Sequence, residues 1–218
     1  MKKERVSYSA WCALDKSPNH LLAYWDRKIE STPAQIQGKL IHKLLLERDK
    51  VEEEFRVYGK TRRGQEWLAF KEENKDYQII TSKEFEAANI VYNKVKDNKW
   101  LVDILMRTGE VEKYIQWERN DQKFHGYVDI VGDDFICDIK TCVDAGEKFE
   151  RDFQFNNYKM QGAMYLEAFD NIKKYKILAI EGEAPEYIKT SKLLASSERH
   201  YPPSNWDGTN WLNPGTPL

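Results

Sequence analysis

The pattern of apolar positions in the middle of the chain predicts a β-hairpin. Apolar, β-branched and aromatic residues run to Val131, a Gly-Asp-Asp turn follows, and a second apolar run begins at Phe135. Successive side chains of a strand point to opposite faces, so Asp138 and Lys140 share a face, and hairpin pairing can bring Asp129 beside Asp138. Two carboxylates and one ammonium would then converge inside strands that are otherwise apolar.

Such a cluster has two interpretations. Burying a charge costs several kcal/mol unless it has a partner, so a divalent cation would suit the two acids. Alternatively, Asp138 and Lys140 form a salt bridge on a solvated strand face, and Asp133 and Asp134 are ordinary turn residues. The hairpin alone leaves both open, because a D-x-K triplet is short and common.

Helix start signals organise the N-terminal part of the chain. Ser17-Pro18 and Thr32-Pro33 each place a capping side chain before a proline at the first helical position. The second pair predicts a helix through Glu47 with an apolar stripe. Gly38 lies in this helix at a cost of about 1 kcal/mol in helix propensity, so we expect another element to approach its face closely.

The remaining elements follow from periodicity and turn residues. We expect strands at Phe55–Gly59, Val111–Glu118, Lys123–Val131, Asp134–Thr141 and Lys174–Ile180, and helices at Gln65–Asn74, Lys83–Lys96 (capped by Ser82), Trp100–Arg107 and, as one long helix, within Lys148–Phe169. A single domain over residues 1–218 is expected, with a helical part to about residue 108, a meander and helix at about 109–182, and a polar tail from 183. The role of Trp206 and Trp211 in that tail is left open.

Composition narrows the class of protein. The chain has 218 residues, 41% of them hydrophobic and 32% charged, which is typical of a soluble globular protein. A formal net charge of −2 excludes a generally basic coat for nucleic acid but not a local basic groove. The three cysteines lack the number and spacing of a structural zinc site. Without a signal peptide or a membrane-length apolar run, we expect a cytoplasmic protein that does not bind membranes.

The order and spacing of several short motifs resemble the PD-(D/E)xK nuclease superfamily, and within it phage-type exonucleases similar to RecE and lambda exonuclease. The resemblance covers nearly the whole chain. It is carried by the segment Gly38–Glu47 with its histidine His42, the basic loop with Arg62 and Arg63, Glu112 before Trp117, Asp129, Asp138-Ile139-Lys140, and the Q-x-x-x-Y motif at Gln161 and Tyr165.

The resemblance implies an α/β (α+β) fold with a restriction-endonuclease-like core, in which helices flank a central mixed β-sheet. It further implies that one or two Mg²⁺ or Mn²⁺ ions are bound by His42, Asp129, Asp138 and the backbone carbonyl of Ile139. Catalytic roles are implied for Lys140, which would hold the attacking water or neutralise the phosphate, and for Glu112, Gln161 and Tyr165. Phosphates of the DNA would be contacted by Arg62, Arg63, Gln161 and Tyr165. Three cysteines cannot supply the four thiolates of an iron–sulfur cluster, so none is expected.

The function implied is a metal-dependent DNA exonuclease of phage-type recombination, encoded by a phage or prophage and active in the bacterial cytoplasm. By resemblance it would degrade one strand of linear duplex DNA in the 5′ to 3′ direction and leave a single strand for a RecT-like annealing protein. Relatives form rings, so a homo-oligomer is implied. The alternatives are a related endonuclease, a single-strand-preferring nuclease, and a non-catalytic DNA-binding or assembly module that retains the fold. For single residues, His42 can be structural, Gln161 and Tyr165 a polar cap, and Arg62 and Arg63 a solvated loop.

Overall fold

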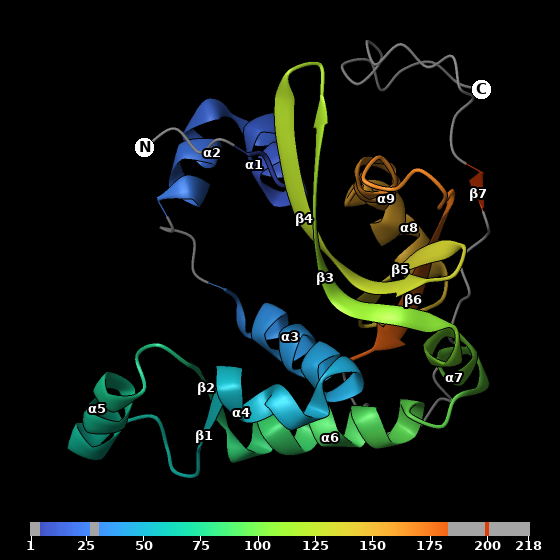
Figure 1. The fold of residues 1–218 in the computed structure, drawn as a ribbon. Coiled ribbons are helices and arrows are strands. Elements are labelled where there is room, and N and C mark those ends of the chain that lie inside the picture. The colour runs from blue at the N-terminus through green and yellow to red at the C-terminus, as the bar shows by residue number, and fades with distance from the viewer. Residues whose placement is uncertain (1–4, 27–30, 183–198, 201–218) are drawn as a thin grey trace.

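The structure is a computed structural model that describes residues 5–26, 31–182 and 199–200 (Figure 1). The expected polar tail, with Trp206 and Trp211, falls almost entirely outside the described residues. Among the helices that are described, none is long and apolar enough to cross a membrane.

Helices dominate the first half of the chain and strands the second. The helices are α1 (Tyr8–Lys16), α2 (Pro18–Trp25), α3 (Pro33–Leu46), the 3-10 turn η1 (Arg48–Lys50), α4 (Val51–Glu54), α5 (Gly64–Glu73), α6 (Ser82–Val95), α7 (Lys99–Met106), α8 (Glu147–Phe155) and α9 (Tyr158–Leu166). The strands are β1 (Phe55–Tyr58), β2 (Gln78–Thr81), β3 (Thr108–Arg119), β4 (Gln122–Gly132), β5 (Phe135–Cys142), β6 (Lys174–Glu181) and β7 (Arg199–His200).

The central sheet is mixed, with strand order β3-β4-β5-β6-β7. Strands β3, β4 and β5 form the expected antiparallel meander, and β6 pairs parallel to β5, with Asp138 beside Ile177. Parallel neighbours need a crossover connection, which α8 and α9 provide. The prediction of a restriction-endonuclease-like core with a mixed sheet is therefore confirmed.

Helices cover both faces of this sheet (Figure 1). On one face, Leu40 and Ile41 of α3 pack with residues of α6 and α7 against Ile139 and its strand neighbours. On the other face, Met160 and Met164 of α9 pack against Ile136 and the β3–β4 hairpin. Burial of these side chains contributes about 25 cal/mol per Å² of apolar area and holds β4 and β5 between two helical layers.

Gly38 shows the close approach that its place in a helix predicts. A Cβ atom at this position would lie 2.8 Å from Thr141 Oγ1, a distance that real Cβ atoms essentially never show. Helix α3 can therefore pass directly over the end of β5, which places His42 one turn later beside that strand.

Two expectations for the elements are wrong, and one strand was not predicted. The long helix within Lys148–Phe169 is broken into α8 and α9, because Asn157 adopts a left-handed backbone with φ 52°. The cap of α6 is Thr81 rather than Ser82, since Thr81 and Glu84 form a capping box. Strand β2 has no counterpart among the predictions, and it pairs parallel to β1 in a separate two-stranded sheet.

Candidate active site

Three elements bring His42, Asp129 and Ile139 together. His42 Nδ1, on α3, lies 3.5 Å from Asp129 Oδ2 on β4. The backbone N–H of Ile139, on β5, donates to the same Asp129 oxygen at 2.6 Å. The hairpin register pairs Ile130 with Cys137, so Asp129 lies opposite Asp138 as the alternation of strand residues predicts.

Glu112 completes a possible metal site. His42, Glu112 and Asp129 each offer one ligand atom, and the three atoms lie within 4.8 Å of one another. The register of β3 and β4 pairs Val111 with Ile130 and Lys113 with Val128, which places Glu112 opposite Asp129.

The backbone of Glu112 is strained. Its φ is +48°, a left-handed conformation that costs a residue with a Cβ about 1–2 kcal/mol. Backbone strain of this kind is frequent at functional sites, where it re-aims a side chain. The resemblance implied a catalytic role for Glu112, and the structure places its carboxylate with His42 and Asp129 in the three-residue group.

Asp138 is held by a separate set of contacts. Gln161 Nε2 donates to Asp138 Oδ1 at 3.2 Å and lies 3.3 Å from the hydroxyl of Tyr165, one helical turn further along α9. Lys140 forms an ion pair with the same carboxylate. The Q-x-x-x-Y residues and the D-x-K residues therefore meet, as the resemblance implies, although their catalytic roles stay predictions.

Tyr158 is a residue of this region that the sequence did not suggest. The ammonium of Lys140 lies 5.0 Å from the centre of its ring, within the range of a cation–π interaction. Its position at the start of α9, three residues before Gln161, is the signal that could have pointed to it.

Burial and neighbouring negative charges make the ionised form of these carboxyl groups unfavourable. Asp129 is 9% exposed and Asp138 3% exposed. Burial raises the pKa of Asp129 well above its ordinary value, and the neighbouring charge of Asp138 raises it further. Burial also raises the pKa of Glu112. A cation among these carboxylates would offset the repulsion.

The two basic side chains, His42 and Lys140, differ in their protonation at neutral pH. Burial lowers the pKa of His42 to about 4, so at neutral pH the imidazole is uncharged and keeps a nitrogen lone pair. Burial alone would lower the pKa of Lys140, but the charges of Asp138 and Asp129 outweigh it and raise that pKa. Lys140 is therefore a cation at neutral pH, which suits charge neutralisation better than removal of a proton.

The donor set fits a divalent cation. Two carboxylate oxygens and one imidazole nitrogen are available within a small, partly buried space, next to the negative charge of Asp138. Carboxylates suit Mg²⁺ and Mn²⁺ equally, and the nitrogen is more favourable for Mn²⁺.

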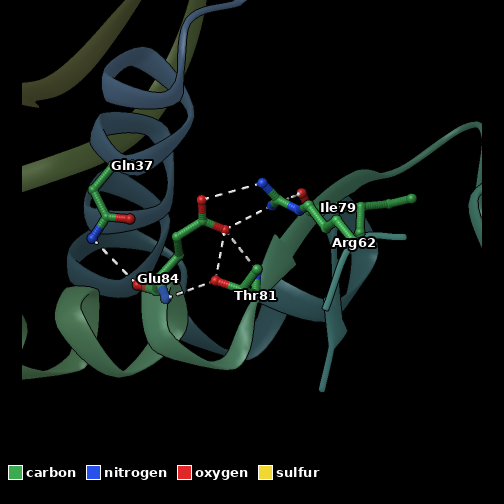
Figure 2. A network of polar contacts seen from close by, with 5 residues as sticks. All are labelled: Gln37, Arg62, Ile79, Thr81 and Glu84. Carbon is green, nitrogen blue, oxygen red and sulfur yellow. Dashed lines mark hydrogen bonds and ion pairs between the residues drawn. The ribbon is translucent and has the colours of Figure 1, made fainter. Parts of the chain in front are cut away.

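Arg62 is part of a polar network outside this site (Figure 2). Arg62 Nη2 donates to Glu84 Oε2 at 2.7 Å and to the carbonyl of Ile79 at 2.9 Å. Glu84 also accepts from Thr81, and its carbonyl accepts from Gln37 of α3 at 3.3 Å. The network fastens the loop before α5 to α6, and β1, β2 and α5 lie away from β4 and β5 (Figure 1). The structure thus does not bring Arg62 to the acids, and the contact of Arg62 and Arg63 with DNA stays a prediction.

Comparison with known proteins agrees with this architecture. A family model for a PDDEXK-like domain of unknown function (DUF3799) matches residues 7–197. A solved structure from Eubacterium rectale, of a protein named "Putative exonuclease", superposes with a TM-score of 0.57 and 13% sequence identity, covering 83% of this chain and 69% of that one. None of the curated proteins matches the chain. At 13% identity the structural likeness concerns the fold.

Proposed function

This chain belongs to the family of PDDEXK-like domains whose model it matches, within the PD-(D/E)xK nuclease superfamily, and on that premise we propose that it is a metal-dependent deoxyribonuclease. The observation that carries the proposal is the convergence of His42, Glu112 and Asp129 beside the Asp138–Lys140 ion pair. An acidic cluster with a neutral histidine is suited to a cation, and the adjacent ammonium is suited to a phosphate.

Each residue of the site has a separate proposed role in phosphodiester hydrolysis. A divalent cation supplies a water of lowered pKa and polarises the phosphoryl oxygen. His42, Glu112 and Asp129 would hold that cation, with Asp138 and the carbonyl of Ile139 as the further ligands that the resemblance implies. The ammonium of Lys140, which pairs with Asp138, would neutralise the charge that develops on the phosphate. Gln161 fixes the Asp138 carboxylate through its amide, and Tyr165 adjoins that amide.

We propose the specific activity from the resemblance: exonucleolytic removal of one strand of linear duplex DNA from a 5′ end, in phage-type recombination. A ring-shaped homo-oligomer and a RecT-like annealing partner belong to the same proposal, with Mg²⁺ or Mn²⁺ as the cofactor. Light scattering of the purified protein would measure the oligomeric state directly, and a monomer at working concentration would contradict the ring.

The test of the activity uses two DNA substrates. Purified protein is incubated with linear duplex DNA, labelled at a known end of one strand, and with covalently closed circular duplex, in Mg²⁺, Mn²⁺ or EDTA. Metal-dependent loss of the linear DNA alone, beginning at 5′ ends, is the expected result. Nicking of the closed circle would identify an endonuclease instead.

A Lys140→Ala variant separates catalysis from binding. It should lose cleavage while retaining metal-dependent DNA binding, because the ammonium is proposed to act on the phosphate during the reaction. Unchanged turnover would make Lys140 a structural ion-pair partner. Binding of DNA ends without any cleavage by the wild-type protein would favour the non-catalytic module.

A further inference from the structure

A cavity of about 860 Å³ adjoins the active site. His42 and Lys140 line it at the active site, and it extends between α3 and the pair α1–α2, which Figure 1 shows to one side of α3. Each helix contributes residues about one turn apart, such as Cys12 and Lys16 of α1 and His20 and Tyr24 of α2. We refer to this cavity as the α1–α3 groove.

The groove is basic. Lys16, Lys39 and Lys140 line it together with two histidines, and none of the described lining residues is an aspartate or a glutamate. The chain as a whole has 36 acidic and 34 basic residues, so this bias is local. Lys16 and Lys39 are exposed, and neither forms an ion pair with another described residue. Two unpaired ammonium groups are thus available to an anionic ligand that also reaches the active site.

The size of the groove limits the ligand. Its volume lies within the range of about 300–1,000 Å³ that holds a compact ligand, which accommodates a few nucleotides of one strand but cannot enclose a duplex. Tyr24 presents an aromatic ring, and such rings stack on bases of unpaired strands without regard to sequence. Positively charged side chains beside an aromatic ring are the combination that binds single-stranded nucleic acid.

The wall of the groove is fixed by polar contacts. The side chain of Ser17 caps α2, and its Oγ lies 2.8 Å from His20 Nδ1. Ser7 Oγ and the hydroxyl of Tyr24 lie 3.4 Å apart and join the two helices. The hydroxyl of Tyr8 donates to the carbonyl of Asn156 at 2.5 Å and so ties α1 to the junction between α8 and α9. These contacts hold α1 and α2 against each other, and they hold α1 against the α8–α9 region.

We propose that the α1–α3 groove binds a short single-stranded segment of the DNA strand being cut, with its phosphates on Lys16 and Lys39, and leads it to the metal-binding residues. The proposal rests on the nuclease function proposed above and adds the form of the substrate that occupies the site. A strand must therefore be separated from its complement over the length of the groove before it is cut.

Binding is measured without cleavage. Fluorescence anisotropy in EDTA compares a labelled oligodeoxythymidylate with a duplex of equal length, over a series of salt concentrations. The variants are Lys16→Gln with Lys39→Gln, and Lys94→Gln as a control, since Lys94 is exposed on α6 outside the groove. Thermal unfolding establishes that each variant is folded.

The wild-type protein should bind the single strand more tightly than the blunt duplex. The double variant should bind the single strand several-fold more weakly, and the slope of log K against log salt should fall by about 0.7 for each lysine lost. Lys94→Gln should leave both quantities unchanged. Tighter binding of the duplex, or a double variant no weaker than the control, would overturn the proposal.

Cleavage in Mn²⁺ separates the two proposals. A wild-type protein that binds the single strand through Lys16 and Lys39 but never cuts it overturns the nuclease and retains the groove. A wild-type protein that cuts DNA, with a double variant that binds and cuts equally well, overturns the groove and retains the nuclease.

Discussion

Asp129 is a buried carboxyl group that lies close to two other acids and accepts the backbone N–H of Ile139. An asparagine keeps the shape and the acceptor oxygen while removing one of the converging negative charges. We therefore expect Asp129→Asn to unfold in EDTA at the same temperature as the wild type or higher. Loss of a metal contact removes several kcal/mol of transition-state stabilisation, so cleavage should fall by more than about 100-fold.

The metal response of this variant is the decisive measurement. A ligand that binds only the folded state raises the unfolding temperature, so Mn²⁺ should stabilise the wild type. That shift should be absent or much smaller in Asp129→Asn, with a distant exposed change such as Lys71→Gln on α5 as the control. A full metal-induced shift together with wild-type cleavage would mean that the metal lies elsewhere.

Residues of the site differ in how far the sequence could place them. Strand alternation and the motif order predicted that Asp129, Asp138 and Lys140 would meet, and they do. The position of Glu112 beside Asp129 depends on a positive φ within β3, which no residue type at this position signals. The motif order identified Glu112 as a candidate, but it did not predict the backbone conformation of Glu112.

At the scale of elements, the break between α8 and α9 depends on a single residue. Asn157 takes the left-handed conformation, which asparagine tolerates better than most residues and glycine adopts freely. Asn157→Gly should therefore leave the free energy of unfolding nearly unchanged, whereas Asn157→Val should lower it by about 1–2 kcal/mol. Urea unfolding followed by circular dichroism measures both, and equal stability of the two variants would show that the break is not sensitive to φ.

The C-terminal end of α3 gives a prediction for pH. Hydrogen bonds from Lys43 and Lys50, at 2.7 and 2.5 Å, hold the pKa of Glu47 below its ordinary value. A lowered folded-state pKa contributes stability above the unfolded pKa of about 4.3, and that contribution is lost as the pH falls through the folded value.

Glu47→Gln should therefore lower the free energy of unfolding at pH 7 by about 0.5–1 kcal/mol. The difference from the wild type should shrink as the pH falls below about 4.3 and disappear once the pH is below the folded-state pKa of Glu47. Thermal unfolding between acidic and neutral pH measures this, with Glu73→Gln on α5 as a control that forms no ion pair with a described residue. A difference that persists at acidic pH would assign the effect to packing.

Elements with strong periodicity were predictable, and those that depend on tertiary contacts were not. The meander and α3 carry clear alternation or an apolar stripe, so their positions are confirmed within a few residues. Strand β2 is four residues long and gains its pairing from β1, which is distant in sequence. Helices α8 and α9 are continuous in their apolar pattern, and the change in direction comes from backbone geometry at one position.

At the scale of the molecule, the arginines of the basic loop have different surroundings. Arg62 is engaged by Glu84 and Ile79, whereas Arg63 is exposed and forms no ion pair with a described residue. Arg62→Gln should lower the free energy of unfolding by about 0.2–1 kcal/mol. Arg63→Gln should leave stability unchanged and weaken binding of duplex DNA, reducing the salt slope by about 0.9. Parallel unfolding and anisotropy measurements compare them, and equal effects on binding would contradict the division of roles.

The α1–α3 groove marks the limit of inference from sequence at this scale. Its lysines belong to helices with no shared motif, and only tertiary packing brings α1 and α3 to the same side of β5. The resemblance gave the fold class, and the arrangement of helices around the site required the structure.

The wide spacing of the site residues along the chain has a consequence for biosynthesis. The side chains that meet in the site enter in the order α3, β3, β4, β5 and α9, and β6, which flanks β5 in the sheet, is made later still. A nascent chain that has not yet released α9 and β6 from the ribosome lacks both the amide that fixes Asp138 and the strand that supports it. Translation products that stop before α9 and β6 therefore lack a complete candidate site.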